Sequence, residues 1–284
     1  IETLETERRQ QSKDGTVKYL FRLPDGNCIE TVLMRYSYGN TVCVSTQVGC
    51  RMGCRFCAST QGGRVRNLTA GEIANEVYAA ARDTGERVSH IVLMGIGEPL
   101  DNFDHVMDFL SIISSPNGVN IGMRNISLST CGLVPMIYKL AERHLGLTLS
   151  VSLHAPTDEM RSSMMPVNDV YPVEQLIRAC RDYQQETGRR VSFEYSMVNG
   201  VNDSPQTARR LAQLIKGMGA HVNLIPINPV DGSPYSATDA ANVKRFQTLL
   251  TELGVNATVR RRLGTDISAA CGQLRREAKG GTTA

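Results

Sequence analysis

Apolar residues along the chain follow two periods in turn, and this pattern predicts strands that alternate with helices. Continuous apolar runs typical of buried strands lie at residues 41–46, 90–96, 125–130, 147–153, 190–198 and 222–227. Between them, apolar residues recur every three or four positions, as on the buried face of an amphipathic helix. These helical stripes lie at residues 73–80, 106–113, 176–183, 211–218 and 246–253. Strands alternating with helices form βαβ units, so the pattern predicts a parallel sheet.

Local signals mark the ends of several of these elements. The segment Thr16–Arg22 alternates apolar and polar residues, Pro24–Gly26 supplies a turn, and Ile29–Met34 returns, which predicts an N-terminal β-hairpin. Thr69 and Glu72 have the spacing of a capping box at a helix start. Glycines that follow the helical stripes and predict helix ends are Gly85, Gly188, Gly219 and Gly254.

The number of strand–helix units predicts the fold class. Six units are too few for a complete eight-fold barrel, so we expect an α/β fold of the open (β/α)6 partial TIM barrel type. The barrel would span residues 40–276, with the β-hairpin extension at residues 1–39 and a flexible tail at residues 277–284. A doubly wound open sheet is the alternative. A length of 284 residues and 41% hydrophobic content suit one large domain.

Composition and charge indicate the cellular compartment of the protein and the charge of its substrate. No apolar run has the length of a membrane span and no signal-peptide pattern opens the chain, so we expect a cytoplasmic protein. The chain begins at Ile1, and we expect that an N-terminal segment is missing. The net charge of +3 is too small to indicate a nucleic-acid partner. The clustering of arginines, unlike the net charge, favours a polyanionic substrate. One group comprises Arg51, Arg55, Arg64 and Arg66, and a second comprises Arg260, Arg261, Arg262, Arg275 and Arg276.

The cysteines carry the strongest chemical signal. Eight cysteines without a secretion signal argue against a disulfide scaffold. Cys50, Cys54 and Cys57 form a C-x3-C-x2-C triplet directly after the first barrel strand. Three such thiolates can bind three irons of a four-iron cluster and leave the fourth iron open to a small molecule. A structural zinc site is the alternative, but zinc takes four ligands and no fourth ligand lies nearby in the sequence.

Several segments together resemble one family. The triplet in this position is similar to that of the radical S-adenosylmethionine (SAM) superfamily, and the further segments resemble the RlmN/Cfr family of radical SAM methyltransferases. The similarity is greater to the RlmN branch, dual-specificity 23S rRNA/tRNA adenine-C2 methyltransferases, and it extends from the hairpin to Leu274. The segments are Thr46–Cys50 (TQVGC), Cys57–Thr60 (CAST), Gly95–Leu100 (GIGEPL), Ser152–Ala155 (SLHA), Ile225–Pro229 (IPINP) and Asp266–Leu274 (DISAACGQL).

The resemblance implies catalytic roles. Cys50, Cys54 and Cys57 would hold a [4Fe-4S] cluster, and two SAM molecules would be used per turnover. Cys271 would be methylated and Cys43 would resolve the RNA adduct by forming a disulfide. Adenine C2 is an electrophilic carbon, which explains why a methyl group must first be placed on sulfur. Glu30 would be the proton acceptor, although Cys43 could serve instead.

The resemblance also implies a SAM pocket. Its residues follow strand ends, and in parallel α/β folds the carboxyl ends of strands form the active face, so we expect one pocket. They are Gly97, Glu98, Ser129, Ser152, Leu153, His154 and Asn228.

The implied partners are 23S rRNA and tRNA and an electron donor such as flavodoxin, with a monomeric enzyme and no membrane. The family also leads us to expect a small N-terminal accessory domain ahead of the hairpin. A Cfr-like adenine-C8 methyltransferase shares the cluster and both cysteines and is the first alternative. A noncatalytic iron–sulfur RNA-binding protein is the second, but it would have no use for both Cys43 and Cys271.

Overall fold

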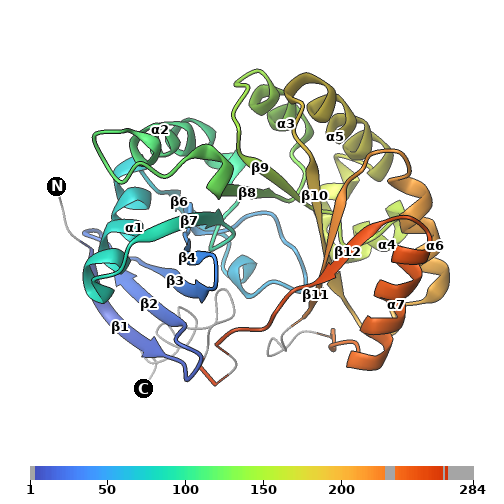
Figure 1. Cartoon of the computed structure of the whole chain (residues 1–284), viewed down its shortest axis with the longest axis horizontal. Coiled ribbons are helices and arrows are strands. Elements are labelled where there is room, and N and C mark those ends of the chain that lie inside the picture. Colours follow the sequence, from blue (N-terminus) through green and yellow to red (C-terminus); the bar gives the residue numbers. More distant parts are fainter. Residues whose placement is uncertain (1–3, 228–233, 265, 268–284) are drawn as a thin grey trace. The chain divides into compact units, whose positions relative to one another are not determined.

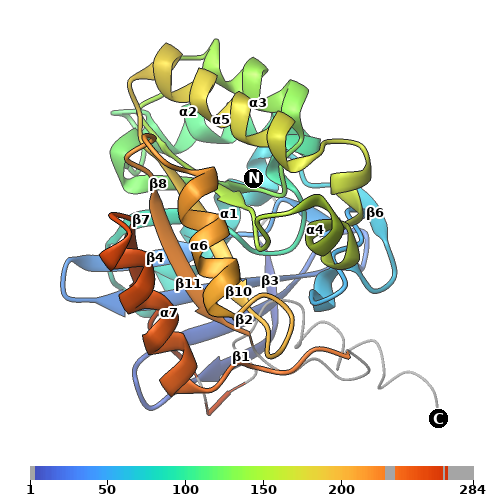
Figure 2. The same ribbon diagram turned by 90° about the vertical axis from the view of Figure 1, so that its right-hand side faces the viewer.

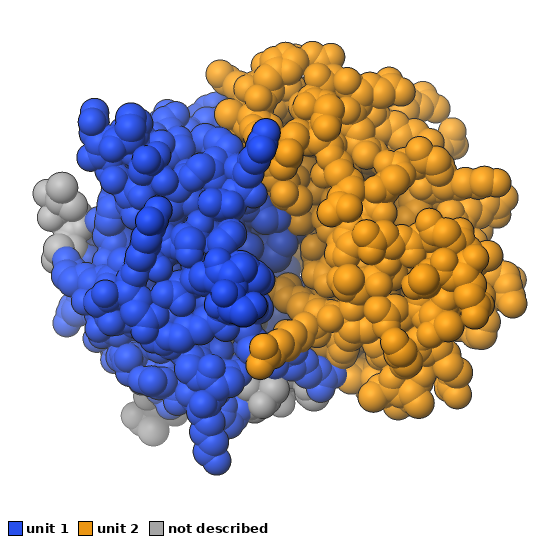
Figure 3. All heavy atoms as spheres, viewed as in Figure 1, with its two compact units in different colours: residues 1–51, 57–129, 262–284 blue, residues 52–56, 130–261 orange. Residues whose placement is uncertain are grey.

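A computed structural model of the chain describes residues 4–227, 234–264 and 266–267. The predicted flexible tail at residues 277–284 lies outside these residues. The chain divides into two compact units, which Figure 3 shows in different colours. Unit 1 comprises residues 1–51, 57–129 and 262–284, and unit 2 comprises residues 52–56 and 130–261.

Unit 1 is built on a sheet that is antiparallel at first and parallel afterwards (Figure 1). Strands β1 to β4 pair antiparallel in chain order, β4 pairs parallel with β7, and β7 pairs parallel with β8. Two short strands, β5 and β6, form a separate antiparallel pair. The strands are β1 (Glu5–Gln11), β2 (Val17–Arg22), β3 (Cys28–Tyr36), β4 (Gly39–Cys43), β5 (Gln47–Gly49), β6 (Arg64–Asn67), β7 (Val88–Leu93) and β8 (Ile126–Thr130).

The helices of unit 1 follow the local signals of the sequence. The predicted capping box is confirmed: Thr69 Oγ1 accepts from the Glu72 N–H, and the Glu72 carboxylate accepts from the Thr69 N–H. Gly85 ends the same helix in the left-handed conformation, with φ +66°. The helices are α1 (Ala70–Thr84) and α2 (Phe103–Ser114), with 3₁₀ turns η1 (Ala58–Thr60), η2 (Pro99–Asn102) and η3 (Met123–Asn125).

Unit 2 is a fully parallel α/β arrangement. Its strands pair in the order β9, β10, β11 and β12 (Figure 1), and Figure 2 shows β10 next to β11. The strands are β9 (Thr148–Ser152), β10 (Val191–Met197), β11 (His221–Pro226) and β12 (Asn256–Val259). The helices are α3 (Val134–Ala141), α4 (Asp158–Met164), α5 (Val173–Thr187), α6 (Pro205–Leu214) and α7 (Ala240–Glu252), with a 3₁₀ turn η4 (Pro166–Asp169).

The predicted strands all occur, each within about three residues of its expected bounds, but the sequence pattern missed others. β1 is a charged edge strand with almost every side chain exposed, and β12 is short with three of its four residues exposed. Neither has an apolar period, because an edge strand packs on the core through few side chains. Among the described residues, no helix has the length and hydropathy needed to cross a membrane.

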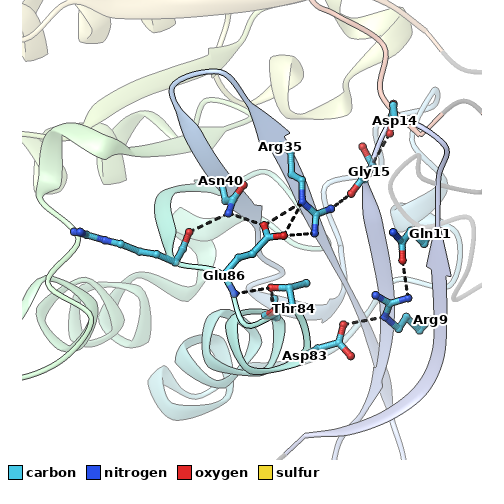
Figure 4. A network of polar contacts seen from close by, with 12 residues as sticks. Arg9, Gln11, Asp14, Gly15, Arg35, Asn40, Asp83, Thr84 and Glu86 are labelled. Atoms are coloured by element: carbon cyan, nitrogen blue, oxygen red, sulfur yellow. Dashed lines mark hydrogen bonds and ion pairs between the residues drawn. The ribbon is translucent and has the colours of Figure 1, made fainter.

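The turn between β1 and β2 is fixed from two sides (Figure 4). Arg35 of β3 donates to the Gly15 carbonyl and forms a two-pronged pair with Glu86, at 2.8–3.1 Å. On the other side, Asp14 Oδ2 accepts from the N–H of Gly264, 250 residues later, at 2.8 Å. This turn therefore holds the chain segment that follows β12 against unit 1.

Candidate functional site

Four of the predicted site residues lie at the carboxyl edge of the parallel strands of unit 1. Cys43 is the last residue of β4 and lies opposite Val92 of β7. Leu93 of β7 lies opposite Leu128 of β8, so Ser129 is one position beyond that pair. Gly97 and Glu98 lie in the loop that leaves β7. Within unit 1, the structure thus brings Cys43, Gly97, Glu98 and Ser129 to one edge.

A buried serine joins this edge to Glu30. The hydroxyl of Ser45 accepts from the Ile96 N–H at 3.1 Å and donates to the Glu30 carbonyl at 2.7 Å. The Ile96 carbonyl in turn accepts from the Thr46 N–H at 2.8 Å. The main chain of Glu30 and the loop that carries Gly97 are therefore fixed to the same hydroxyl.

Gly97 has both features that demand glycine. Its φ is +112°, which residues with a side chain rarely adopt, and a Cβ there would lie 2.8 Å from the Gln47 nitrogen. The Gln47 side chain accepts from the Glu98 N–H at 2.9 Å. Glu98 is buried, and its Oε1 accepts from the Leu100 N–H at 3.0 Å, so the carboxylate also caps η2.

The cysteine loop is shared between the two units. Cys50 and Cys57 belong to unit 1 and Cys54 to unit 2; Cys50 and Cys54 are buried and Cys57 is half-buried. In unit 2, the Arg55 N–H donates to the Met164 carbonyl at 2.9 Å, which fixes the middle of the loop. Within the described part of the chain, no three His, Cys, Asp or Glu side chains are placed as ligands of one metal ion. The thiolates of a four-iron cluster bind different irons and need not converge on one point.

Three of the arginines near this loop are neutralised within unit 1. Arg51 and Arg64 both bind Asp101, Arg64 at 2.9 Å, and Arg66 binds Glu72 at 2.8 Å as well as Asp25. Burial alone would raise the pKa of Asp101, but its hydrogen bonds, led by that from Arg51, lower it. The first arginine group is therefore largely a network that fixes the loop rather than an open anion site, and Arg51 and Arg55 are its exposed members.

Glu30 forms an ion pair with Lys18, a residue that no pattern in the sequence indicated. Lys18 Nζ lies 2.9 Å from Glu30 Oε2, and the two side chains are 0% and 3% exposed. Removing one partner of such a buried pair typically costs about 3–5 kcal/mol. Lys18 stands among alternating residues of the predicted hairpin, where it resembles a solvent-facing position. Its burial follows only because β2 is covered on both faces.

Cys43 lies beside this pair on the sheet. Val32 of β3 is opposite Lys18 on one side and opposite Cys43 on the other. Directly opposite residues share a face of the sheet, and Glu30 lies on the same face two positions away. Val32, Met34 and Cys43 form a buried cluster, and Leu263 packs against it. The segment that leads toward Cys271 thus reaches the Cys43 face.

In unit 2, His154 connects the end of β9 with the cysteine loop. It is buried and has φ +57°, its Nδ1 accepts from the Ser196 N–H at 2.9 Å, and its carbonyl accepts from Asn202 at 2.7 Å. Its ring meets the edge of Phe56 at a centroid distance of 4.9 Å. Burial, and secondarily the charge of Arg161, lower the pKa of His154 to about 3. The imidazole is therefore neutral and carries its proton on Nε2.

Arg161 is a second residue near the candidate site that no pattern in the sequence indicated. Its side chain is completely buried in unit 2 and donates to three main-chain carbonyls: Cys131 at 2.6 Å, Leu153 at 3.1 Å and Ser152 at 3.2 Å. It fixes the segment in which we expect Ser152, Leu153 and His154 to contact SAM. No sequence motif indicates it, because every residue has a main-chain carbonyl, so hydrogen bonds to carbonyls do not require particular residue types at the partner positions.

Two predicted residues, Asn228 and Cys271, lie outside the described residues. The single pocket expected for residues of both units therefore stays a prediction.

Comparison with known proteins gives a consistent picture. The sequence profile of the Radical SAM superfamily matches residues 44–212. The chain is 57% identical over 265 residues to the "Probable dual-specificity RNA methyltransferase RlmN" of Desulforamulus reducens, covering 93% of this chain and 76% of that protein. It is 56% identical over 268 residues to the protein of the same name from Desulforudis audaxviator, covering 94% of this chain and 84% of that one.

A solved structure agrees with the fold. The crystal structure of a radical SAM methyltransferase from Sphaerobacter thermophilus superimposes with a TM-score of 0.93 at 49% sequence identity, over 96% of this chain and 81% of that chain. This match confirms the predicted mixed α/β fold with a parallel sheet and preceding antiparallel strands.

Proposed function

Since the chain belongs to the Radical SAM superfamily and, within it, to the RlmN family of RNA methyltransferases, we propose that it methylates C2 of adenine in 23S rRNA and tRNA through a methylated cysteine. One observation carries the proposal. Glu30 and Cys43 share one face of neighbouring strands, and the segment that leads to Cys271 packs on that face through Leu263. This arrangement supports the proposal, because it would bring the Glu30 carboxylate and the Cys43 thiol close to a methylated Cys271.

The residues present suit the cofactors of the superfamily, a [4Fe-4S] cluster and SAM. Cys50 and Cys54 are buried and Cys57 is half-buried, and thiolates are the ligands that iron–sulfur clusters use. Gly97 offers main chain without a side chain, and Glu98 offers a buried carboxylate for the ammonium group of SAM. When bound, SAM and the cluster would supply a methyl group for one step, a hydrogen-abstracting carbon radical for another, and an acceptor for one electron.

The protein's own residues would then act in sequence. The Cys271 thiolate takes a methyl group by displacement, and after loss of one hydrogen atom its methylene carbon bonds to adenine C2. The adduct loses the C2 proton, which we assign to Glu30, and one electron. The Cys43 thiolate then forms an S–S bond with Cys271 as the C–S bond breaks; the electron pair of that bond stays on the methylene carbon, which takes a proton to become the methyl group.

Two further features are part of the proposal. A low-potential one-electron donor such as flavodoxin would reduce the cluster, and the enzyme would work in the cytoplasm as a monomer. Sedimentation of the cluster-loaded protein would test the oligomeric state.

The reaction itself is tested by anaerobic reconstitution with iron, sulfide, a reductant, methyl-labelled SAM and RNA. We expect labelled 2-methyladenosine in both rRNA and tRNA after nucleoside analysis. Labelled 8-methyladenosine would instead assign the chain to the Cfr-like chemistry. Absence of any labelled adenosine, with an intact cluster and 5′-deoxyadenosine formed, would contradict the proposal.

The two cysteines should fail differently. Cys271→Ala should accept no methyl group and form no RNA adduct. Cys43→Ala should carry the methyl group, join to RNA and stall, because no thiol releases the adduct. A denaturing gel of Cys43→Ala would show slow-migrating protein that nuclease returns to its normal position. RNA-free Cys43→Ala with an intact cluster and methylated Cys271 would remove Cys43 from the mechanism.

A further inference from the structure

The Lys18–Glu30 pair is unusually placed for an ion pair of a sheet. Both side chains are almost completely buried, and the Nζ–Oε2 distance is 2.9 Å. A second ion pair of β2, Arg22 with Glu7, is 40% and 36% exposed and lies at the strand's end. Burying two charges is costly and a surface pair is worth little, so fold stability alone does not explain why a charged pair lies here.

We propose that Lys18 is a positioning residue for the proton transfer: it holds the Glu30 carboxylate oriented toward the adduct formed beside Cys43. This inference rests on the proposed function, because it assumes that Glu30 takes the C2 proton. Lys18 itself exchanges no proton in the step. The proton of C2 moves to the Glu30 carboxylate, and the electron pair of the C–H bond stays in the purine.

The geometry gives Lys18 this role in two ways. The main chain of Glu30 is already fixed, since Ser45 donates to its carbonyl at 2.7 Å. Only the side-chain torsions of Glu30 then need a constraint, and the Lys18 ammonium supplies it at the carboxylate end. The ammonium also places a compensating charge beside a carboxylate that is only 3% exposed.

The sheet register places the ammonium where it does not block the reaction. Lys18 approaches from β2 and Cys43 from β4, with Val32 of β3 between them. Neighbouring strands lie about 5 Å apart, so the lysine and cysteine backbones flank Glu30's strand from opposite sides. Lys18 thus holds the carboxylate from the side away from the thiol.

The test separates the steps of the reaction in the full-length, cluster-loaded enzyme. Three quantities are measured: methyl on Cys271 by mass spectrometry, covalent RNA adduct on a denaturing gel, and released 2-methyladenosine. For Glu30→Gln we expect methylation and adduct to remain while release falls at least about 100-fold, the usual minimum effect of a lost acid–base group. For Lys18→Met we expect the same pattern with release down at least about tenfold.

Further variants show whether Lys18 acts through Glu30. The double variant Lys18→Met/Glu30→Gln should release no less product than Glu30→Gln alone, because positioning has no effect once the base is gone. Lys18→Arg should recover release to within about tenfold of the wild type. Arg22→Met, which removes a cation from the same strand, should leave the ratio of adduct to product unchanged. If Lys18→Met does not fold, Lys18→Gln, which retains a hydrogen-bond donor, replaces it with the same expected result.

The outcomes distinguish the two hypotheses. Normal release by Glu30→Gln would overturn Glu30 as the proton acceptor, and with it the proposed function's proton step. A stalled Glu30→Gln together with normal release by Lys18→Met would overturn the role of Lys18 alone. Equal loss of Cys271 methylation, adduct and product in Lys18→Met would show that the pair only supports the fold, and it would also overturn the inference.

Discussion

At single positions of this site, close packing and backbone conformation restrict which residue can be present, in addition to the chemistry of the side chain. Gly97 has no room for a Cβ, and His154 is kept neutral by burial and used as an acceptor for the Ser196 N–H. In both cases the main chain of a strand-end loop is held in a conformation with positive φ. Such conformations are costly and persist only where the surrounding contacts impose them, which is typical of functional loops.

Gly97→Ala should therefore destabilise the protein and prevent SAM binding. It combines the cost of a positive φ with a contact of 2.8 Å to the Gln47 nitrogen, which adds about 1–3 kcal/mol of overpacking. Gly62→Ala is the matched control, since Gly62 has φ +106° but open space at its Cβ position. We expect Gly97→Ala to melt at least roughly 2–4 °C below Gly62→Ala, measured by thermal unfolding of both. Equal melting temperatures and normal SAM affinity would contradict this.

At the scale of elements, the β1–β2 turn acts as an anchor for the segment after β12. Asp14 accepts from the Gly264 N–H, and Asp266 accepts from the Ser12 hydroxyl and from the Lys13 N–H at 3.1 Å. The anchor keeps Leu263 on the Cys43 face. Its strength matters for the proposed mechanism, since two thiols on one chain react at a rate set by their effective concentration.

Asp14→Asn should loosen this segment without unfolding the protein. Partial burial would raise the pKa of Asp14, but the hydrogen bonds, led by that from Gly264, lower it to about 2. A carboxylate whose pKa falls on folding stabilises the folded state above its unfolded value of 3.8, and this stabilisation is lost as the pH falls through about 2. The anchor is thus constant between pH 5 and 8.

Hydrogen exchange of the peptide over residues 260–267, corrected for intrinsic rates, would measure the effect at pH 7. We expect roughly fivefold faster exchange in Asp14→Asn, because a hydrogen bond to a charged acceptor is worth about 1 kcal/mol more than a neutral one. Asp108→Asn, an exposed change on α2, should exchange like the wild type. Identical exchange in Asp14→Asn would mean that the turn does not hold the segment.

At the scale of the whole molecule, charge is arranged more for internal order than for a broad anion-binding surface. The net charge is only +3, and Arg51, Arg64 and Arg66 are paired with carboxylates. Arg55, Arg261 and Arg262 are exposed. We therefore expect RNA phosphates to be met by a few arginines at specific positions.

Salt dependence of RNA affinity tests this view. Arg261→Ala/Arg262→Ala should reduce the slope of log affinity against log salt by about 2, one for each lost phosphate contact. Arg66→Ala should leave the slope unchanged and lower the melting temperature instead, because Arg66 binds Glu72 and Asp25. A slope that falls equally in both would indicate that the paired arginines also meet RNA.

The sequence by itself determined the features that depend on neighbouring residues. Apolar periods marked the parallel strands, Thr69 and Glu72 marked the start of α1, and the spacing of Cys50, Cys54 and Cys57 indicated an iron–sulfur cluster. Each of these is a short-range pattern, because hydrogen bonds within a helix and ligation by one loop join residues a few positions apart.

Only the tertiary structure decided which distant residues meet. The sequence pattern predicts that Lys18 is exposed, but the fold covers β2 on both faces and buries it. The arginines near the cysteines resemble an open basic group in the sequence, but in the fold Arg64 and Arg66 pair with Asp101 and Glu72. The hydrogen bond between Asp14 and Gly264, and the packing of Leu263 on the cluster that contains Cys43, join chain segments more than 200 residues apart. Such contacts follow from strand register and from burial by the whole fold, and no local pattern of apolar and polar residues encodes either.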